Sequence, residues 1–252
     1  MPDLTRQELI KILAVTDGAR LGNYVKELGV FNGPYFVESY EEVEKLASLP
    51  VVQGWVERLA QQYGIRVVCF NWVQGYRHFM TNKPVRRPED LRGLRIRTPP
   101  APVWQESVRA LGATPVALPF GEIYSALQQR AIDGAELVYA NIPDMSLWEV
   151  LRYVNETKHF HLINFQVVGE AWYQRLPANY RQILREECVR AGRETSMRIQ
   201  QEEARIKQLV QQRGMTIVSD VDLAAFRKAA ETAYERLGLK AVRDALYQAL
   251  RK

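Results

Sequence analysis

The sequence predicts an α/β protein, and three patterns along the chain carry this prediction. Between residues 94 and 138 the hydrophobic spacing runs strand–helix–strand–helix–strand, which is typical of a mostly parallel sheet with helices on its faces. Residues 158–168 form a long run of β-forming residues, which we expect to be a strand that crosses between two domains. Residues 177–213 keep apolar residues at helical spacing with a single glycine, so an unusually long helix is expected there.

The first part of the chain carries the same kinds of signal. Residues 10–16 form an apolar run that ends at Asp17, which predicts a strand running into a loop that faces a ligand. Ser39 and Glu42 have the spacing of a capping box, so a helix is expected to begin beside Ser39. The other expected elements are strands at residues 65–73, 94–98, 114–118, 132–138 and 215–218, and helices at residues 52–63, 103–111, 122–129 and 148–153, with further helices after residue 218.

The composition is that of a folded protein and excludes a membrane-spanning one. Of 252 residues, 47% are hydrophobic and 25% are charged, which suits one large domain or two small ones. No apolar run is long enough to cross a bilayer. The formal net charge is +5, but basic and acidic residues alternate along the helices, so solvated helix faces explain the charge better than a nucleic-acid surface. The exception is residues 77–97, where six arginines gather.

The cysteines and the N-terminus bear on the cellular compartment. Cys69 lies in an apolar run and is expected in the core, whereas Cys188 lies in a helical segment. A disulfide between them is possible but weakly supported by the pattern, and neither belongs to a CxxC motif. The cysteines therefore do not indicate whether the protein works in an oxidising or a reducing compartment. The first residues, MPDLTRQELIK, lack a basic stretch followed by an apolar one, so no signal peptide is visible.

Common catalytic motifs are absent from the sequence. It contains no GxSxG elbow, no P-loop and no GxGxxG, so the usual hydrolase, phosphate-binding and dinucleotide sites are not indicated, and no cofactor is expected. His159 and His161 share one face of an expected strand and could bind a metal together with Glu136. No further metal ligand follows at a familiar spacing. We therefore favour a structural role, in which one histidine is hydrogen-bonded near a carboxylate and the other lies at the surface.

The arginine-rich segment holds the best candidates for a binding site. Arg77 follows a glycine where the strand at residues 65–73 is expected to leave the sheet, and Arg97 lies at the end of another expected strand. In open α/β sheets ligands bind beyond the carboxyl ends of strands, where a guanidinium can hold a carboxylate by two parallel hydrogen bonds. A structural ion pair with Glu or Asp is the equally weighted alternative.

Several segments resemble the solute-binding proteins of tripartite ATP-independent periplasmic (TRAP) transporters, the DctP-type family. They cover nearly the whole chain in the family's order. The quoted segments are NKPVRRPEDLRGLRIR at residues 82–97, LGATPVALPFGEIYSALQ at residues 111–128, IDGAE at residues 132–136, EVLRY at residues 149–153 and TKH at residues 157–159. The match continues through Trp172 and Pro177 into the long helix.

The resemblance implies a two-lobed, periplasmic-binding-protein-like fold that closes on a small organic acid and delivers it to a membrane permease. Such a receptor is periplasmic, is not an enzyme, binds no nucleic acid and does not insert into the membrane. We expect lobe I to comprise residues 1–74 and 163–202, and lobe II to comprise residues 75–162 and 203–252. The long helix would span both lobes and bend as they close.

The resemblance also assigns roles to individual residues. Arg97 is expected to be the principal clamp on the ligand carboxylate, with Arg77 as a second cation beside it. Glu136 and His159 are expected to orient the main arginine from behind. Loss of Arg97 should weaken binding by well over tenfold, since charge-assisted hydrogen bonds contribute about 1.5–3 kcal/mol each.

Further ligand contacts follow from the same resemblance, with two departures. Phe120 is expected to pack its ring on the ligand, and Thr16 and Asp17 are expected to face the pocket from the other lobe. Many family members have Asn where this chain has Leu137, and some have Asn where it has Pro100. Both changes favour a less hydroxylated, more apolar acid than a sugar acid.

A third departure concerns the start of the sequence, and two rival functions stay open. Family members begin with a signal peptide and further strand–helix units before the segment that matches residues 10–16, so lobe I is expected to lack strands. A truncated record, a misassigned start codon or a degenerate homologue would each explain this.

A ligand-sensing module of the same fold is one rival function, although no helix-turn-helix is apparent. A small metalloenzyme using His159, His161 and Glu136 is the other.

Overall fold

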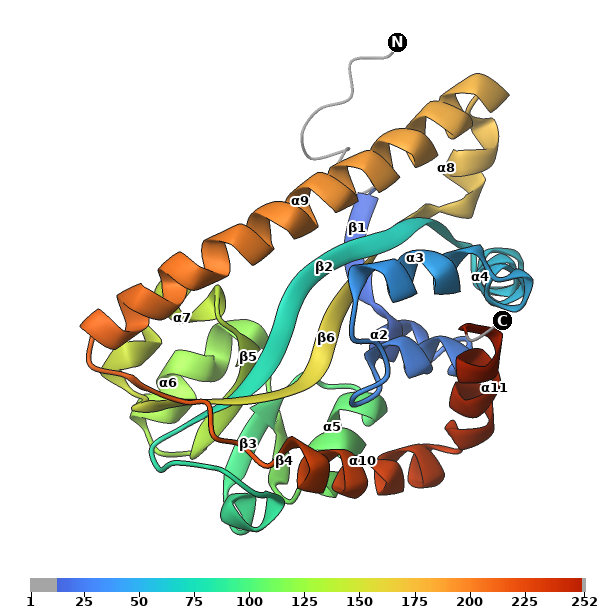
Figure 1. Ribbon diagram of the computed structural model, residues 1–252. Coiled ribbons are helices and arrows are strands. Elements are labelled where there is room, and N and C mark those ends of the chain that lie inside the picture. Colours follow the sequence, from blue (N-terminus) through green and yellow to red (C-terminus); the bar gives the residue numbers. More distant parts are fainter. Residues whose placement is uncertain (1–12, 251–252) are drawn as a thin grey trace.

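A computed structural model of the protein describes residues 13–250 and shows one mixed sheet covered by helices (Figure 1). The strand order is β1-β6-β2-β5-β3-β4, with β7 beside β6. The strands are β1 (Leu13–Asp17), β2 (Ile65–Thr81), β3 (Arg95–Thr98), β4 (Thr114–Ala117), β5 (Gly134–Val138), β6 (Tyr153–Gly169) and β7 (Thr216–Val218). The α-helices are α2 (Gly18–Leu21), α3 (Tyr40–Ser48), α4 (Pro50–Tyr63), α5 (Pro102–Ala110), α6 (Ile123–Gln128), α7 (Asn141–Asp144), α8 (Glu170–Arg175), α9 (Ala178–Gln212), α10 (Leu223–Leu237) and α11 (Lys240–Leu250). The 3₁₀ helices are η1 (Lys26–Asn32), η2 (Pro88–Leu91), η3 (Phe120–Glu122) and η4 (Leu147–Glu149).

The prediction of a mostly parallel sheet is correct for only part of the sheet. Strand β3 pairs in parallel with β4 and β5, and β7 pairs in parallel with β6. By contrast β6 runs antiparallel to both of its neighbours β1 and β2, and β2 runs antiparallel to β5. The parallel part coincides with the segment that showed strand–helix alternation, because only parallel neighbours need a crossover helix.

Two strands of 17 residues each, β2 and β6, run through both halves of the molecule. The expected crossing strand is β6. The expectation that residues 75–77 leave the sheet is wrong, because β2 continues to Thr81. A register shift between Val73 and Tyr76 accommodates Gly75, whose φ is 91°. Such irregularities bend a strand without ending it. At the next register shift, between Arg77 and Phe79, Lys158 of β6 also has positive φ.

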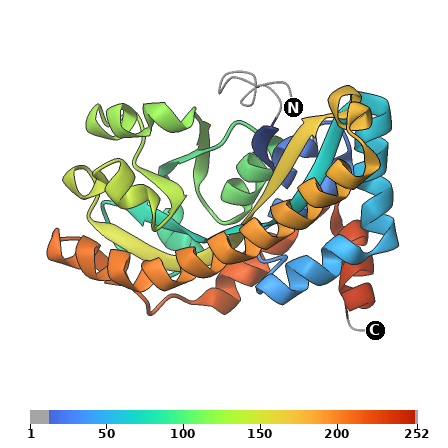
Figure 2. The same cartoon turned by 90° about the horizontal axis from the view of Figure 1, so that it is seen from above.

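Helix α9 confirms the predicted long helix and lies along β2 across the whole molecule (Figures 1 and 2). At Gly192 the helix touches the strand: a Cβ atom there would lie 2.6 Å from the Asn71 Oδ1 atom. One turn further on, the Ser196 hydroxyl accepts a hydrogen bond of 2.9 Å from the Val73 N–H. Small residues at helical spacing thus fasten the N-terminal half of α9 to β2. A cavity of about 630 Å³ lies farther along, between the middle of α9 and the bulged strands.

A disulfide joins Cys69 of β2 to Cys188 of α9, with the two Cα atoms 6.0 Å apart. The sequence left this pairing open because the two residues are 119 positions apart. Cys69 is buried, as expected from its apolar surroundings. The same half of α9 that packs on β2 is therefore also covalently attached to it.

Local helix signals are largely confirmed. The Ser39 Oγ atom accepts a hydrogen bond of 3.2 Å from the Glu42 N–H at the start of α3. The Glu42 carboxylate accepts from the Glu38 N–H at 2.9 Å, one residue before the position expected for a capping box. The helix expected at residues 148–153 is only the short turn η4, because β6 begins at the end of that range.

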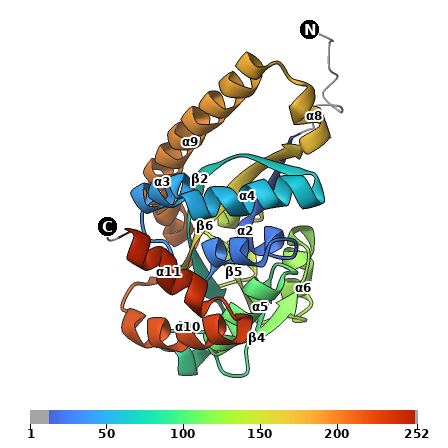
Figure 3. The same cartoon turned by 90° about the vertical axis from the view of Figure 1, so that its right-hand side faces the viewer.

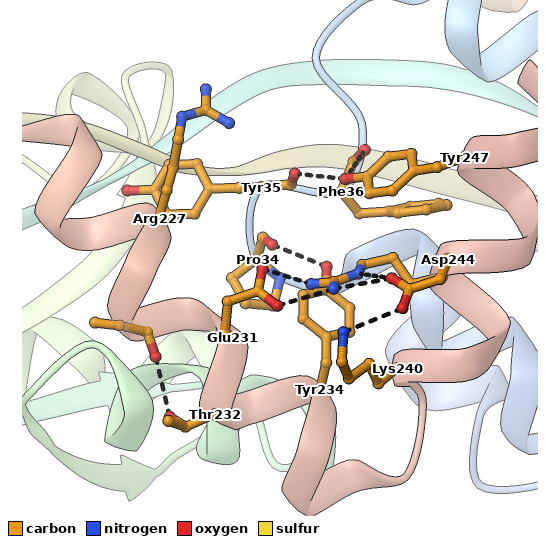
Figure 4. A network of polar contacts seen from close by, with 12 residues as sticks. Pro34, Tyr35, Phe36, Arg227, Glu231, Thr232, Tyr234, Lys240, Asp244 and Tyr247 are labelled. Atoms are coloured by element: carbon orange, nitrogen blue, oxygen red, sulfur yellow. Dashed lines mark hydrogen bonds and ion pairs between the residues drawn. The ribbon is translucent and has the colours of Figure 1, made fainter. Parts of the chain in front are cut away.

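The C-terminal helices contact different parts of the molecule (Figure 3). Helix α10 packs on α5, whereas α11 packs on α3 and η1. The hydroxyl of Tyr247 on α11 donates hydrogen bonds of 3.0 Å to the carbonyls of Tyr35 and Phe36. The hydroxyl of Tyr234 on α10 donates one of 2.8 Å to Pro34 (Figure 4). Both helices thereby hold the segment that leads into α3.

Among residues 13–250, no helix has both the length and the apolar character needed to span a bilayer.

Candidate functional site

The carboxyl ends of the parallel strands β3, β4 and β5 meet at one edge of the sheet, and Arg97 lies there. Arg97 pairs with Val116 of β4 and with Ala135 of β5. Its side chain is only 2% exposed, and its Nε donates a hydrogen bond of 2.9 Å to the Leu118 carbonyl. Within the described part of the chain, no carboxylate lies at salt-bridge distance from its guanidinium. Arg97 is therefore a buried cation without a direct counter-charge.

The electrostatics of Arg97 agree with its geometry. Burial lowers the pKa of Arg97 to about 10, because removal from water disfavours the charged form. The Glu136 charge opposes this shift, while the positive charges of Arg77 and Arg20 add to it. The side chain still carries its charge at neutral pH, so this edge of the sheet attracts anions.

Arg77, the second arginine of the expected site, forms an ion pair within the protein. It lies inside β2 opposite Val138 of β5, where its Nε forms a buried ion pair with the Glu136 carboxylate and its Nη2 donates to the Glu136 carbonyl. Its guanidinium also lies 5.2 Å from the centre of the Trp104 ring. Of the two alternatives for the arginines, a ligand clamp or a structural ion pair, Arg77 forms the ion pair. The antiparallel register of β2 and β5 brings its side chain to Glu136.

Glu136 and His159 contact Arg77 and its surroundings rather than Arg97. Burial is the largest single influence on Glu136 and raises its pKa, but the charge and hydrogen bond of Arg77, together with the neighbouring His159, outweigh it and hold the pKa at about 2. The other oxygen of Glu136 accepts a hydrogen bond of 2.8 Å from the Thr98 hydroxyl. The His159 Nε2 atom is 3.9 Å from the carboxylate, too far for a direct hydrogen bond. Glu136 therefore acts on Arg97 through its charge and through the neighbouring Thr98, and not by a direct hydrogen bond.

The residues predicted on the other lobe lie at the end of β1. Asp17 is buried, caps α2 by accepting a hydrogen bond of 2.9 Å from the Arg20 N–H, and forms an ion pair with the Arg20 side chain. Thr16 precedes it and is partly exposed. Sequence reasoning missed Arg20, whose charge contributes to lowering the pKa of Arg97. Its spacing of three residues from a capping Asp was the available signal.

The two predicted apolar contacts differ in exposure. Phe120 opens η3 shortly after β4, and it is 46% exposed. Leu137 is fully buried among the apolar side chains that pack around α6 and the C-terminal end of α9. The structure thus gives Leu137 a place in the core and no exposed surface.

The three residues of the alternative metal site do not converge. His161 stacks on Tyr76 with ring centres 4.6 Å apart, whereas His159 stacks on Phe79 and approaches Glu136. Across residues 13–250, no group of three or more His, Cys, Asp or Glu side chains could hold a metal ion.

All three histidines are expected to make the protein sensitive to mild acid. Burial lowers the pKa of His78, His159 and His161, the last to about 4. Unfolded histidine titrates near 6.5, so between pH 6.5 and about 4 the unfolded chain binds more protons, and lowering the pH favours unfolding. For His161 alone the loss approaches about 3 kcal/mol near pH 4.

Urea unfolding between pH 7.5 and 4.5 checks this expectation. His161→Phe keeps an aromatic ring against Tyr76 but cannot bind a proton, so its stability should fall less steeply with pH than that of the unchanged protein. Parallel curves for the two proteins would contradict the assignment.

Comparison with known proteins decides the family. The family described as "Bacterial extracellular solute-binding protein, family 7" (DctP) matches residues 8–240. The chain belongs to this family. Among curated DctP relatives, a solute-binding protein of Roseobacter denitrificans is 27% identical over 216 residues, which are 86% of this chain and 66% of that protein. The C4-dicarboxylate-binding periplasmic protein DctP of Rhodobacter capsulatus is 29% identical over 62% of this chain and 46% of its own length. The matches thus span about half to two thirds of these relatives.

Solved structures of TRAP periplasmic solute-binding proteins confirm the two-lobed α/β fold. The one from Escherichia fergusonii, in an open form without ligand, is 31% identical, with a TM-score of 0.85 over 99% of this chain and 86% of that one. The one from Ochrobacterium anthropi, with bound L-fuconate, is 28% identical, with a TM-score of 0.89 over 98% of this chain and 83% of that one.

Proposed function

We propose that this DctP-family chain is the solute receptor of a TRAP-type secondary transporter, which binds a small organic acid between its lobes and delivers it to the permease subunits. The observation that carries the proposal is Arg97, a buried cation at the strand ends with no carboxylate of its own. The bound L-fuconate in the Ochrobacterium anthropi protein supports an acid as the ligand. Arg77 and Arg20 are already paired with Glu136 and Asp17, so of these three arginines Arg97 is the one left for an anion.

The geometry suits a two-point grip on a carboxylate. The Leu118 carbonyl takes the Nε–H of Arg97, which leaves the Nη groups for the ligand. Parallel N–H···O bonds from a guanidinium to a carboxylate are charge-assisted and directional. Because the arginine is already desolvated and fixed in the fold, little further ordering is needed when the acid binds.

The connections between the lobes suit closure about a hinge. Three long elements, β2, β6 and α9, join the lobes, and the irregularities at Gly75 and Lys158 lie within the two strands. The attached half of α9 ends near Ser196, and Lys207 forms an ion pair of 2.7 Å with Glu156 on the far side. Bending is therefore expected in the intervening part of the helix.

The disulfide is consistent with an extracytoplasmic location. Disulfides persist in oxidising compartments such as the bacterial periplasm and are rare in the cytosol. The Cys69–Cys188 bond thus agrees with delivery of the ligand to a permease from outside the cytoplasm.

A thermal-shift screen against small mono- and dicarboxylates tests the proposal, with the carboxamide of each acid as its matched control. A ligand that binds only the folded chain at about 100 times its Kd adds about 2.7 kcal/mol of stability, which is a rise of roughly 5–10 °C. We expect at least one acid to raise the melting temperature and its amide not to. Cooperative melting with no shift for any acid would contradict the proposal.

A further inference from the structure

The chain segments that follow β3 and β4 begin beside Arg97, since Thr98 is its neighbour in sequence and the Leu118 carbonyl accepts a hydrogen bond from its Nε. They are residues 98–101 and 118–121, which read TPPA and LPFG. Thr98 has the one polar side chain in these two segments, and its hydroxyl is held by Glu136 at 2.8 Å. Neither segment therefore offers an uncommitted polar side chain to a ligand.

The backbone of these segments is poor in hydrogen-bond donors as well. Pro99, Pro100 and Pro119 have no N–H. The Leu118 N–H donates to the Thr98 carbonyl at 3.3 Å, and the Ala101 N–H donates to the Pro99 carbonyl at 2.9 Å. The Leu118 carbonyl already accepts from Arg97. Few backbone groups are thus left to hold the hydroxyl groups of a ligand.

The end of β5 repeats this arrangement. The Tyr139 hydroxyl is held by Glu156 at 3.0 Å, and the amide oxygen of Asn141 accepts from the Val138 N–H at 3.3 Å. Leu137, the position before Val138, is buried in the core. At the ends of β3 and β4 the side chains are thus apolar or already bonded within the protein, and at the end of β5 the Tyr139 hydroxyl and the Asn141 amide oxygen are bonded as well.

We propose that the site takes hydroxyl-poor carboxylates with an aliphatic or aromatic tail, so that Arg97 holds the carboxylate and Pro100, Pro119 and Phe120 cover the tail. Pro100 and Pro119 are exposed, as is the ring of Phe120. Burying an apolar tail against them is favourable, whereas a ligand hydroxyl that leaves water without a partner is penalised. This inference rests on the acid-receptor function proposed above and specifies its substrate class.

Calorimetric titration of the full chain with hexanoate and with D-gluconate tests this proposal. Both ligands are six-carbon monocarboxylates, and they differ in the hydroxyl groups of the chain. We expect hexanoate to bind at least ~10-fold more tightly than gluconate, since unpartnered polar groups carry this order of discrimination. Phe120→Ala should weaken hexanoate binding by about 10-fold, and Phe120→Leu should restore much of it. Tyr180→Ala, which removes a 41% exposed ring on α9, should leave binding unchanged.

Each contrary result has a distinct meaning. Tighter binding of gluconate than of hexanoate would overturn the assignment of an apolar ligand and leave the acid-receptor function standing. Equal weakening of both acids by Phe120→Ala would also overturn it, because the ring would then support the site without selecting the tail. If neither these acids nor any acid of the wider panel binds, the receptor function and this inference both fail.

Discussion

Replacing Arg97 by alanine is expected to weaken acid binding by about 100-fold, while the free energy of unfolding changes little. Two charge-assisted hydrogen bonds to the ligand are lost, together worth about 3 kcal/mol at the lower end of their range. Without ligand, the variant loses the hydrogen bond from Arg97 to the Leu118 carbonyl. It also no longer buries a positive charge, and the lowered pKa of Arg97 shows that this burial is unfavourable. Arg97→Lys should be intermediate, since an ammonium keeps the charge without the planar two-point geometry.

The same strand offers a matched control. Arg95 lies two residues away on β3, but its side chain is 45% exposed and pairs with Asp133 at 2.9 Å. Arg95→Ala should therefore leave acid binding within about twofold, as expected for an exposed pair. Arg77→Met, unlike Arg97→Ala, should mainly affect stability. It should lower the free energy of unfolding by about 3–5 kcal/mol, because it leaves Glu136 buried without its partner.

Calorimetric binding and chemical denaturation of the three alanine and methionine variants separate these roles. Unaltered acid affinity in Arg97→Ala, in a protein that still unfolds cooperatively, would exclude Arg97 as the clamp.

Removing the disulfide is expected to lower the free energy of unfolding by about 4–5 kcal/mol. The bond closes a loop of 119 residues, and in the chain-entropy description the constraint on the unfolded state grows with the length of the loop. It also holds α9 on β2 beside the close contact at Gly192, so its loss should loosen the N-terminal half of the helix. Ligand affinity should change less than stability, because Cys188 lies on α9 against β2, whereas Arg97 lies near the end of β3.

Urea unfolding of the double variant Cys69→Ala/Cys188→Ala, with and without a dithiol reductant, measures this effect. The reductant should destabilise the unchanged protein to about the level of the variant and should not affect the variant itself. An unfolding midpoint that is the same in oxidised and reduced protein would show that the bond contributes no stability.

Patterns within a short stretch of sequence were sufficient for several features. The helical spacing from Ala178 to Gln212 predicted α9, and Ser39 predicted the start of α3. The strand-end position of Arg97 followed from its place in the strand–helix alternation. Each of these depends on contacts between residues close in sequence, which periodicity and capping describe well.

The sequence by itself thus determined the α/β class, the long helix and an arginine at a strand end, and the resemblance to TRAP receptors added the two lobes. Tertiary structure alone decided that β2 continues past Gly75, that Glu136 pairs with Arg77, and that α11 packs on α3. Each of these depends on the register between strands or the packing of segments far apart in sequence. A shift of one residue in register turns a side chain to the opposite face, so local pattern could not show which of the two arginines would be left with a free charge.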